Sequence, residues 1–398
     1  MPKLLEINVT RNHGATGKIT EQIGLLAQKD GWDVYVAHGA RYVNPSMLRS
    51  YQVQGKVGEY FHALKSLLLD ADGLGSTCAT RRLISFIKSI NPDVIHLHNI
   101  HGYYLNYKVL FEYLNGTDIP VVMTLHDCWS FTGHCIHFVT ANCDKWKDCC
   151  SDCPQKRSVP RSLFLDMSKR NFTLKKTLIA GNRNLTIVCV SKWLEDFVRQ
   201  SMYKNHDIRL IHNGIDLDLF NPVLPKGGEK FSILCIGNPM TRDKGLYDIY
   251  KLRTLLPREE YEITIVGLKD NDLKKLPQGI KGMCRTSNQH DLVQLYSQSE
   301  VFVNPTYADT FPTTNIEALA CGTPVITYRT GGSPEILSPE TGIVVGQGDV
   351  HALADAIVRM RTHPFSSLSC RQRAESLYDK DERFADYISL YNSLIAKK

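Results

Sequence analysis

The sequence predicts an α/β protein with two domains, each built on a doubly wound parallel sheet. Its 398 residues exceed the length that one hydrophobic core usually serves, so two domains of roughly 150–200 residues are expected. In both halves of the chain, short apolar runs alternate with segments in which apolar residues recur at helical spacing. This alternation is typical of parallel strands that are covered by helices.

The first half opens with a strand, a glycine-rich loop and a helix. Residues 3–10 are largely apolar, as in a buried strand, and the following loop contains Gly14 and Gly17. Apolar residues then recur at helical spacing at Ile19, Ile23 and Leu26. Further strand-like runs begin at Val34, Val94, Val121 and Leu185, and helical segments are expected around residues 60–70, 78–90 and 105–114. Together they predict a first domain over residues 1–195, with a Cys-rich insertion at about 128–155.

The second half repeats this pattern after a linker. Asn213-Gly214 and the stretch from Pro222 to Pro225 predict the linker. Strand-like runs then begin at Phe231, Tyr261 and Val301, and a helix is expected from Val350. These elements predict a second domain over residues 205–375. In the final segment, 376–398, an amphipathic helix that needs an apolar surface to cover is predicted by the spacing of Phe384, Ile388, Tyr391 and Ile395.

Charge and hydropathy exclude several classes of protein. Lys and Arg number 47 against 41 Asp and Glu, a net charge of +6, which suits an anionic substrate or a membrane lipid. No basic run is dense enough to form a nucleic-acid patch. Glu6 and Asn8 interrupt the first apolar run, so no signal peptide is expected, and no apolar stretch reaches the ~18–20 residues that cross a bilayer. We therefore expect a cytoplasmic protein whose membrane contact, at the inner face of the membrane, is peripheral.

Two carboxylates stand eight positions apart in the second half. Asp309 follows the apolar run that starts at Val301, and Glu317 lies about one turn into a predicted helix. The first N–H groups of a helix have no internal partner, so they can bind a phosphate or sugar oxygen while nearby carboxylates bind sugar hydroxyls. The alternative from spacing alone is a helix-capping acid and a solvated glutamate.

The residues around this acid pair resemble the donor-site signature of the family 4 retaining glycosyltransferases. The chain reads Asp-Thr-Phe-Pro-Thr-Thr-Asn-Ile-Glu at 309–317, then Ala-Leu-Ala-Cys-Gly-Thr-Pro-Val-Ile, and then a Gly-Gly-Ser-Pro-Glu turn at 331–335. The glycine-rich loop, the strand of His126, the segment His-Asn-Gly-Ile-Asp at 212–216 and the loop of Lys244 come before it in the family's order. The resemblance implies the GT-B fold, in which two facing Rossmann-like domains enclose a cleft and the last helix packs back on the N-terminal domain.

The resemblance further implies that the second domain binds a nucleotide sugar. Glu317 would bind the ribose hydroxyls, and Asp309 with the backbone of Thr310 and Phe311 would bind the sugar that is transferred. The family usually has a glutamate where Asp309 stands and a glycine where Pro312 stands, and proline has no N–H to offer. These departures place the donor specificity at Asp309.

Positive groups and glycines are expected around the diphosphate. Lys244 resembles the family's phosphate-binding lysine, and Arg242 substitutes for an arginine that the family more often has at the position of Asn238. Both cations precede a predicted helix, where they need either an anion or solvent. In the first domain, the loop of Gly14 and Gly17 is either a plain tight turn or, as the resemblance implies, bare backbone that lets the diphosphate approach a helix N-terminus.

His126 ends a predicted strand at the edge where open α/β sheets bind ligands. A lone histidine at a strand end is often structural, but the resemblance implies a catalytic histidine close to the donor sugar. An imidazole there can hydrogen-bond a sugar hydroxyl and favour developing positive charge. Asp127 either orients His126 or caps the next turn. The predicted catalytic residues are therefore His126, Lys244 and Asp309.

Another strand end carries polar and aromatic residues that form a candidate acceptor site: His98, Asn99, His101 and Tyr103. Amides can bind sugar hydroxyls, and rings can stack on the C–H faces of sugars. The alternative is a polar helix start with buried tyrosines.

Six of the twelve cysteines fall between Cys128 and Cys153. In a reducing compartment, such clustering favours a metal site or core thiols over disulfides. Cys135, Cys143, Cys150 and Cys153 could form a tetrahedral zinc site that stabilises an insertion without a core of its own. Reduced or buried thiols and disulfides are the alternatives.

By this resemblance, the protein moves a sugar from a UDP- or GDP-sugar to a saccharide or lipid-linked saccharide, with retention at the anomeric carbon. The resemblance also implies that catalysis needs no metal or other cofactor. The departing phosphate would act as the base for the acceptor hydroxyl, so no separate general base is expected. The Cys-rich stretch resembles a bacterial subset associated with capsular and exopolysaccharide assembly. A sugar-nucleotide epimerase of the same fold and a non-catalytic nucleotide-sugar-binding protein are the alternatives, which the fold alone does not separate.

Overall fold

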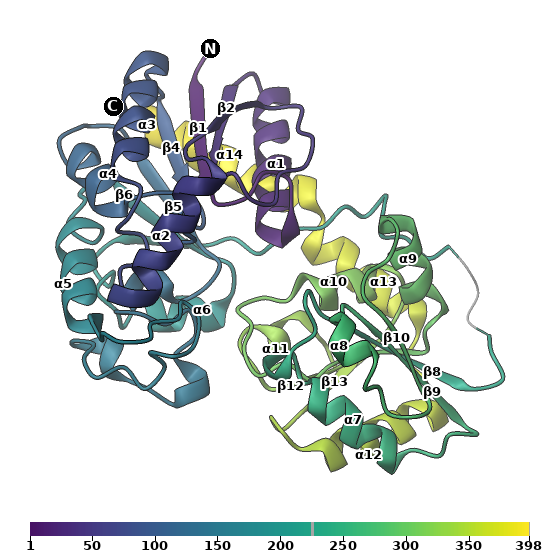
Figure 1. The fold of residues 1–398 in the computed structure, drawn as a ribbon. Coiled ribbons are helices and arrows are strands. Elements are labelled where there is room, and N and C mark those ends of the chain that lie inside the picture. The colour runs from purple at the N-terminus through teal and green to yellow at the C-terminus, as the bar shows by residue number, and fades with distance from the viewer. Residues whose placement is uncertain (224–226, 398) are drawn as a thin grey trace. The chain divides into compact units, whose positions relative to one another are not determined.

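The computed structural model describes residues 1–223 and 227–397, and it divides into two compact α/β units (Figure 1). Unit 1 comprises Met1–His212 together with the residues from Asp381 onward, and unit 2 comprises Asn213–Lys380. Pro225, at the end of the predicted linker, lies outside the described residues. Within the described ranges, no helix combines the length and the apolar character that crossing a membrane requires.

Unit 1 is built on a seven-stranded sheet in which all neighbouring strands are parallel, in the order β3-β2-β1-β4-β5-β6-β7. The strands are β1 (Lys3–Asn8), β2 (Asp33–His38), β3 (Arg49–Gln52), β4 (Val94–Leu97), β5 (Val121–Leu125), β6 (Leu185–Cys189) and β7 (Asp207–Leu210). Strands β4, β5 and β6 are buried along their whole length, as expected for a parallel sheet covered on both faces.

Seven α-helices and three single-turn 3-10 helices accompany this sheet in the described residues. The α-helices are α1 (Gly14–Lys29), α2 (Lys56–Leu69), α3 (Thr77–Ile90), α4 (Tyr107–Leu114), α5 (Ser168–Leu178), α6 (Lys192–Val198) and α14 (Lys380–Ile395). The 3-10 helices, η1 (Trp129–Phe131), η2 (Val139–Ala141) and η3 (Lys145–Lys147), all lie in the Cys-rich insertion. The insertion therefore contains turns and loops rather than long elements.

The last helix, α14, belongs to the core of unit 1. Its residues Phe384, Tyr387 and Tyr391 are buried in one apolar cluster with residues of α1, β1, β2 and β4. Figure 1 shows α14 in yellow beside the purple N-terminal elements. The spacing that predicts this helix from the sequence is thus the spacing of its buried face.

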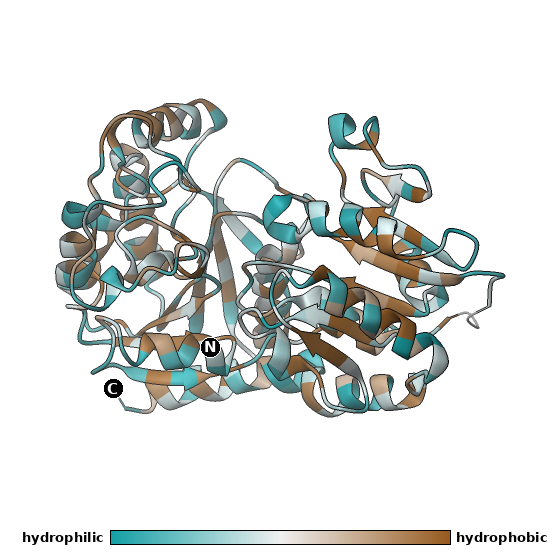
Figure 2. Cartoon of the chain, turned by 90° about the horizontal axis from the view of Figure 1, so that it is seen from below, coloured by the Kyte–Doolittle hydropathy of each residue, from teal (hydrophilic) through white to brown (hydrophobic). Residues whose placement is uncertain are grey.

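Unit 2 is built on a six-stranded parallel sheet in the order β10-β9-β8-β11-β12-β13. The strands are β8 (Phe231–Ile236), β9 (Tyr261–Val266), β10 (Ile280–Met283), β11 (Val301–Asn304), β12 (Val325–Tyr328) and β13 (Gly342–Val345). The helices are η4 (Arg242–Lys244), α7 (Leu246–Leu255), α8 (Asp270–Leu273), α9 (Gln289–Gln298), α10 (Thr313–Ala320), α11 (Ser333–Ile336), α12 (Val350–Thr362) and α13 (Ser367–Tyr378). In Figure 2 the central strands of this sheet are coloured brown, which marks hydrophobic residues.

The boundaries between the units differ from those that the sequence pattern predicts. Residues 205–212 are predicted in the second domain, but β7 pairs with β6 and extends the first sheet. Residues 376–380 are predicted in the final segment, but α13 ends at Tyr378, and Asp379 forms a β-bridge with Ile215 of unit 2. Strand β7 has one buried residue in four, so its short edge pattern gives little signal in the sequence.

Candidate active site

In unit 2, the two loops that follow β8 and β11 are joined by an ion pair between Lys244 and Asp309. The Lys244 Nζ lies 2.6 Å from Oδ2 of Asp309, and the other carboxylate oxygen, Oδ1, accepts a hydrogen bond of 3.3 Å from the Phe311 N–H. Both side chains keep access to solvent, at 33% and 20% exposed. A cation and an acid expected to contact the same donor are therefore neighbours at the carboxyl edge of the sheet.

Close backbone packing explains why these two loops meet. Gly245, which directly follows Lys244, has φ +80°, and a Cβ there would lie 2.3 Å from the Pro305 carbonyl oxygen. The Tyr307 N–H also donates to the carbonyl of Asp243 over 2.8 Å. Only glycine permits this approach, so Gly245 helps to position Lys244 beside Asp309. Arg242 lies at the start of the same turn and is exposed.

A glycine turn supports the Asp309 loop from its other side. A Cβ on Gly331, which has φ +53°, would lie 1.6 Å from the carbonyl oxygen of Asp309. The next residue, Gly332, donates its N–H to the Thr310 carbonyl over 3.0 Å. Thr310 and Phe311 are 5% and 3% exposed, so this loop is tightly packed between Asp309 and α10.

Glu317 lies in the second turn of α10 and is held by a tyrosine. The Tyr296 hydroxyl donates to Oε2 of Glu317 over 3.0 Å, and the ring of Tyr296 is fully buried on α9. Pro312, the residue before α10, provides no side-chain cap for the first N–H groups of this helix. The carboxylate is thus oriented beside an uncapped helix start. Sequence reasoning missed Tyr296, because its place in an apolar helical stripe gives no sign of a polar contact.

In unit 1, the predicted glycine loop forms the N-terminus of α1, and its two glycines differ in their surroundings. Gly14 has φ +67°, and a Cβ there would have no atom within 4 Å. At Gly17, a Cβ would lie 2.5 Å from Oγ1 of Thr10. His13 makes no side-chain cap on this helix. Gly14 therefore leaves open space at a helix start, whereas Gly17 is required for packing against Thr10.

His126 directly follows β5 and is half-buried. Its Nε2 lies 3.1 Å from Nδ1 of His98. Burial lowers the pKa of His126 to about 4, against the opposing attraction of Asp127, and His101 adds a smaller lowering. At neutral pH the imidazole is therefore uncharged and contacts a second uncharged ring.

Asp127 binds His101 rather than the neighbouring His126. One oxygen of Asp127 lies 2.8 Å from Nε2 of His101, and the other accepts a 2.8 Å hydrogen bond from the Trp129 N–H. Burial acts to raise the pKa of Asp127, but the contact with His101 prevails and the pKa is lowered to about 2. The same contact raises the pKa of His101 against the effect of burial. Of the two alternatives for Asp127, the structure shows the second, because Asp127 caps the next turn through the Trp129 N–H, and its other oxygen pairs with His101.

Of the four predicted acceptor residues, His98 faces the core, whereas Asn99, His101 and Tyr103 are half-buried. His98 is 3% exposed, and its ring nitrogens face His126 and Glu6, so it is not presented to an acceptor. Asn99 accepts a hydrogen bond from the Tyr104 hydroxyl at its carbonyl. Burial raises the pKa of Tyr103 to about 12. His101, with its side chain 21% exposed, keeps some access to solvent. The run of polar residues in the sequence cannot show that two of its histidines bind other histidines or acids.

The predicted zinc ligands line one small pocket in the Cys-rich insertion: Cys135, Cys143, Cys150 and Cys153. All twelve cysteines of the chain are free thiols. Cys150 accepts a 3.2 Å hydrogen bond from the Gly133 N–H at its Sγ. A hydrogen bond from Cys135 lowers the pKa of Cys153 to about 7. Among the described residues, no three of these sulfurs lie within 4.8 Å of one another, whereas Zn–S bonds of about 2.3 Å place tetrahedral sulfurs about 3.8 Å apart.

Structural zinc at these cysteines remains a prediction, and zinc would have to draw the four sulfurs together. We expect protein purified without chelator to contain about one zinc ion per chain by elemental analysis. Cys150→Ser should lose that zinc and lower the melting temperature, whereas Cys284→Ser, at an exposed cysteine of unit 2, should change neither. Wild-type protein free of zinc would leave the cluster as reduced thiols.

Two family models match the chain. The model for "Glycosyltransferase Family 4" matches residues 20–219, half of the chain, and the model for "Glycosyl transferases group 1" matches residues 230–363. The "Putative colanic acid biosynthesis glycosyl transferase WcaC" of Escherichia coli (strain K12) is 25% identical over 339 residues, covering 77% of this chain and 78% of that protein. The "Capsular polysaccharide biosynthesis glycosyltransferase CapM" of Staphylococcus aureus is 23% identical, covering 52% and 62% of the two chains.

Solved structures with the same fold cover the whole chain. A sucrose-phosphate synthase from Thermosynechococcus elongatus aligns with a TM-score of 0.76 at 20% identity, covering 100% of both chains. Anabaena HepE, solved in complex with UDP and glucose, aligns with a TM-score of 0.68 at 14% identity, covering 99% of this chain and 100% of that chain. At these identities the alignments establish the fold and leave the chemistry to the residues of the site.

Proposed function

Because the chain belongs to glycosyltransferase family 4, we propose that it transfers a sugar, with retention of configuration, from a nucleotide sugar to a saccharide or lipid-linked saccharide. The protein is a glycosyltransferase with the GT-B fold. The observation that carries the proposal is the Lys244–Asp309 ion pair at the carboxyl edge of the unit 2 sheet, followed along the chain by α10, which bears Glu317. The relatives named for colanic acid and capsule synthesis support a role in cell-surface polysaccharide assembly.

In this reaction, the residues of unit 2 bind the donor. The N-terminus of α10 and Glu317 bind the nucleoside part, with the carboxylate accepting hydrogen bonds from the ribose hydroxyls. Lys244 and Arg242 bind the diphosphate and stabilise the negative charge that grows on it as the glycosidic bond breaks. Lys244 exchanges its contact with Asp309 for the diphosphate, which leaves the Asp309 carboxylate to bind a sugar hydroxyl.

The chemical step needs no separate protein base. The bond between the anomeric carbon and the phosphate oxygen breaks, and the acceptor oxygen forms its bond on the same face of the sugar. The proton of the acceptor hydroxyl passes to the departing phosphate, which is the strongest base formed in the reaction. His126 is uncharged at neutral pH, so it acts by hydrogen bonding and by its dipole rather than by proton transfer.

A screen of nucleotide sugars tests this proposal. We expect one class of UDP- or GDP-sugar to be hydrolysed slowly without acceptor, with release of the nucleoside diphosphate, and to be consumed faster when a suitable saccharide is present. UDP-sugars are the first donors to test, because HepE, a protein of the same fold, was solved in complex with UDP. Tight donor binding without turnover would support the non-catalytic alternative. A donor converted to its epimer without acceptor would support the epimerase, which the family matches do not favour.

We also propose peripheral membrane contact through one face of α2. Val57, Tyr60 and Phe61 are 72%, 62% and 63% exposed on this helix, which is unusual for large apolar side chains that lie close together. The loop that carries Phe164, itself 68% exposed, is joined to α2 by a 2.8 Å hydrogen bond from the N–H of Leu163 to the Leu67 carbonyl. Exposed lysines at positions 56 and 65 add positive charge, which suits anionic lipid headgroups.

Vesicle flotation measures this membrane contact. We expect wild-type protein to float with vesicles that contain phosphatidylglycerol and to stay unbound with pure phosphatidylcholine. The double variant Phe61→Ser/Phe164→Ser should lose most of this binding, because it removes two exposed rings without touching the core. Leu368→Ser, at a residue 64% exposed on unit 2, is the matched control and should bind as the wild type does. Equal flotation of the double variant and the control would contradict the proposed surface.

A further inference from the structure

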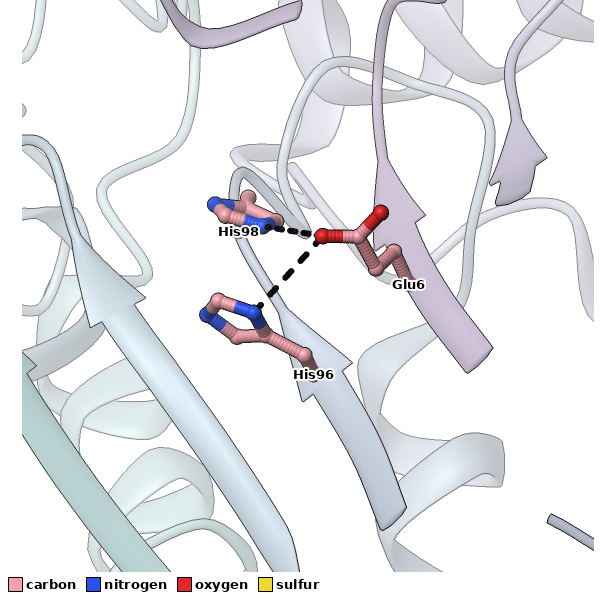
Figure 3. Close-up of side chains that lie close together, drawn as sticks. All are labelled: Glu6, His96 and His98. Atoms are coloured by element: carbon pink, nitrogen blue, oxygen red, sulfur yellow. Dashed lines mark ion pairs between the residues drawn. The ribbon is translucent and has the colours of Figure 1, made fainter. Parts of the chain in front are cut away.

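A cluster of three buried polar side chains lies in the core of unit 1, next to His126. Glu6 on β1 and His96 on β4 are fully buried, and His98, which directly follows β4, is 3% exposed. Figure 3 shows the Glu6 carboxyl group pointing at both rings. Oε1 of Glu6 lies 3.7 Å from Nε2 of His98 and 3.9 Å from Nδ1 of His96. Buried polar groups of this kind are costly unless they have partners, so their arrangement needs an explanation.

The hydrogen bonds of His96 leave His98 as the partner of Glu6. Nδ1 of His96 lies 2.6 Å from the Tyr391 hydroxyl, and its Nε2 lies 2.8 Å from Oγ1 of Thr124. Both nitrogens of His96 are thus occupied. Nε2 of His98 and both oxygens of Glu6 are buried without another hydrogen-bond partner. If the 3.7 Å distance shortened slightly, Oε1 of Glu6 and Nε2 of His98 would form a hydrogen bond. Of the three atoms, only Oε2 of Glu6 would then lack a partner.

The other nitrogen of His98 leads to His126. Nδ1 of His98 lies 3.1 Å from Nε2 of His126, and the two rings are stacked with centroids 5.4 Å apart. A continuous line of polar groups therefore runs from Glu6, in the middle of the sheet, through His98 to His126 at the end of β5. The next residue, Asp127, is engaged by His101 and the Trp129 N–H, so it does not replace His98 in this role.

The environment favours the uncharged form of each member of this line. Burial raises the pKa of Glu6 well above its usual value, and the negative charge of Glu21 on α1 raises it further. Burial also lowers the pKa of His98 well below its usual value, with His96 and His126 acting in the same direction. From α14, the groups that face Glu6 are the hydroxyls of Tyr387 and Tyr391, which are themselves neutral.

Neutral groups give the line a defined direction. A protonated Glu6 is a donor, so Nε2 of His98 must accept, and the single ring hydrogen of His98 is then on Nδ1. This N–H donates to Nε2 of His126, so the hydrogen of His126 is on its Nδ1. We propose that Glu6 and His98 are positioning residues that hold His126 in the neutral tautomer with its hydrogen on Nδ1.

This tautomer deepens the proposed reaction, and its effect on turnover rests on the proposed function. The lone pair on Nε2 of His126 is occupied by the N–H of His98. His126 can then offer a ring N–H to an oxygen but cannot take the proton of the acceptor hydroxyl at Nε2. The proton must therefore go elsewhere, in agreement with the departing phosphate as base.

Two histidines and a glutamate could also bind a metal ion. Glu6, His96 and His98 present ligand atoms within 4.8 Å of one another. Ligands at about 2.1 Å from a tetrahedral metal lie about 3.4 Å apart, which is closer than the 3.7 and 3.9 Å found here. A metal would also have to displace the Tyr391 hydroxyl from His96. The hydrogen bonds from Glu6 through His98 to His126 leave the Tyr391 hydroxyl in place and do not require the three ligand groups to move to metal-binding distances.

Histidine nitrogen NMR tests the inference without substrate. In protein labelled with ¹⁵N-histidine, we expect His126, assigned by the signals missing from His126→Asn, to show the Nδ1–H tautomer at neutral pH. Glu6→Gln keeps an N–H donor towards His98 and should preserve this tautomer, whereas Glu6→Leu has a similar volume but no donor and should give a mixture or the Nε2–H form. Wild-type protein with the Nε2–H tautomer, or with stoichiometric metal at this cluster, would overturn the inference. So would an unchanged tautomer in Glu6→Leu.

Turnover separates this inference from the proposed function. Glu6→Leu should lower kcat by about tenfold or more with little change in the donor KM, and Glu6→Gln should restore it. Glu59→Gln, at a buried carboxyl of α2 that binds the Ala40 N–H, is the control and should keep wild-type turnover. Wild-type turnover in Glu6→Leu would overturn the positioning role while the glycosyltransferase assignment stands. If the wild-type protein turned over no donor, the proposed function would fail, and the NMR result would still decide the tautomer.

Discussion

His126→Ala is expected to abolish sugar transfer while leaving the protein folded. In the proposed reaction, the His126 ring donates a hydrogen bond at the donor sugar, and the loss of one such preorganised donor costs about 10²–10³-fold in turnover. The side chain is half-buried at the end of β5, so its removal leaves no large closed cavity in the core. Release of nucleoside diphosphate with and without acceptor measures the effect, and the melting temperature reports on the fold.

A matched substitution on the surface gives the reference for this result. His351, which is exposed on α12, can be replaced by alanine in the same way and should leave both turnover and melting temperature unchanged. Donor affinity in His126→Ala should stay within a few-fold of the wild type, because the nucleotide is bound by unit 2 in the proposed reaction. Wild-type turnover in His126→Ala would rule out a catalytic role for this histidine.

Glu317→Ala should weaken binding of the nucleotide sugar by about 10- to 100-fold, because the ribose hydroxyls would lose a charged acceptor worth about 1.5–3 kcal/mol. Titration calorimetry with the nucleoside diphosphate measures the loss without any turnover. The same substitution leaves the buried Tyr296 hydroxyl without its 3.0 Å partner. We therefore also expect a loss of about 1–3 kcal/mol in the free energy of unfolding.

A double variant distinguishes the two effects of Glu317→Ala. Adding Tyr296→Phe removes the orphaned hydroxyl, so the stability of the double variant should rise towards that of the wild type while its donor affinity stays low. Tyr296→Phe alone should weaken donor binding only by a few-fold, because the carboxylate is still present but less firmly oriented. Restored affinity in the double variant would mean that Glu317 acts through the fold and not through the ribose.

The sequence predicts the architecture well where its pattern has one clear physical cause. The strands β4, β5 and β11 are buried along their whole length and mostly apolar, because both faces of a parallel sheet are covered. The spacing of Phe384 and Tyr391 predicts α14, because one face of that helix is buried. The pattern predicts the domain boundary near residue 212 wrongly and gives no strand at β7, because an exposed edge strand with one buried residue has no such pattern.

Contacts between distant segments explain what the sequence could not predict about the site. Lys244 and Asp309 are each recognisable in their own motif, but their ion pair depends on the packing of Gly245 against Pro305. The polar run predicts an acceptor role for His98, yet the partners of its ring come from β1 and from the end of β5. Side-chain direction at a strand end is set by the neighbouring strands, and a single sequence does not contain their register.

The place of α14 in unit 1 has a consequence for the order in which the protein forms during synthesis. His96 and the Tyr391 hydroxyl that binds it are 295 positions apart, and all of unit 2 is made between them. The ribosome synthesises α14 only after all of unit 2. Until then, the part of the unit 1 core that α14 covers stays exposed. Unit 2, which is continuous in the chain, can fold during this interval. The cluster of Glu6, His96 and His98 beside His126 is therefore among the last parts of the newly made enzyme to be completed.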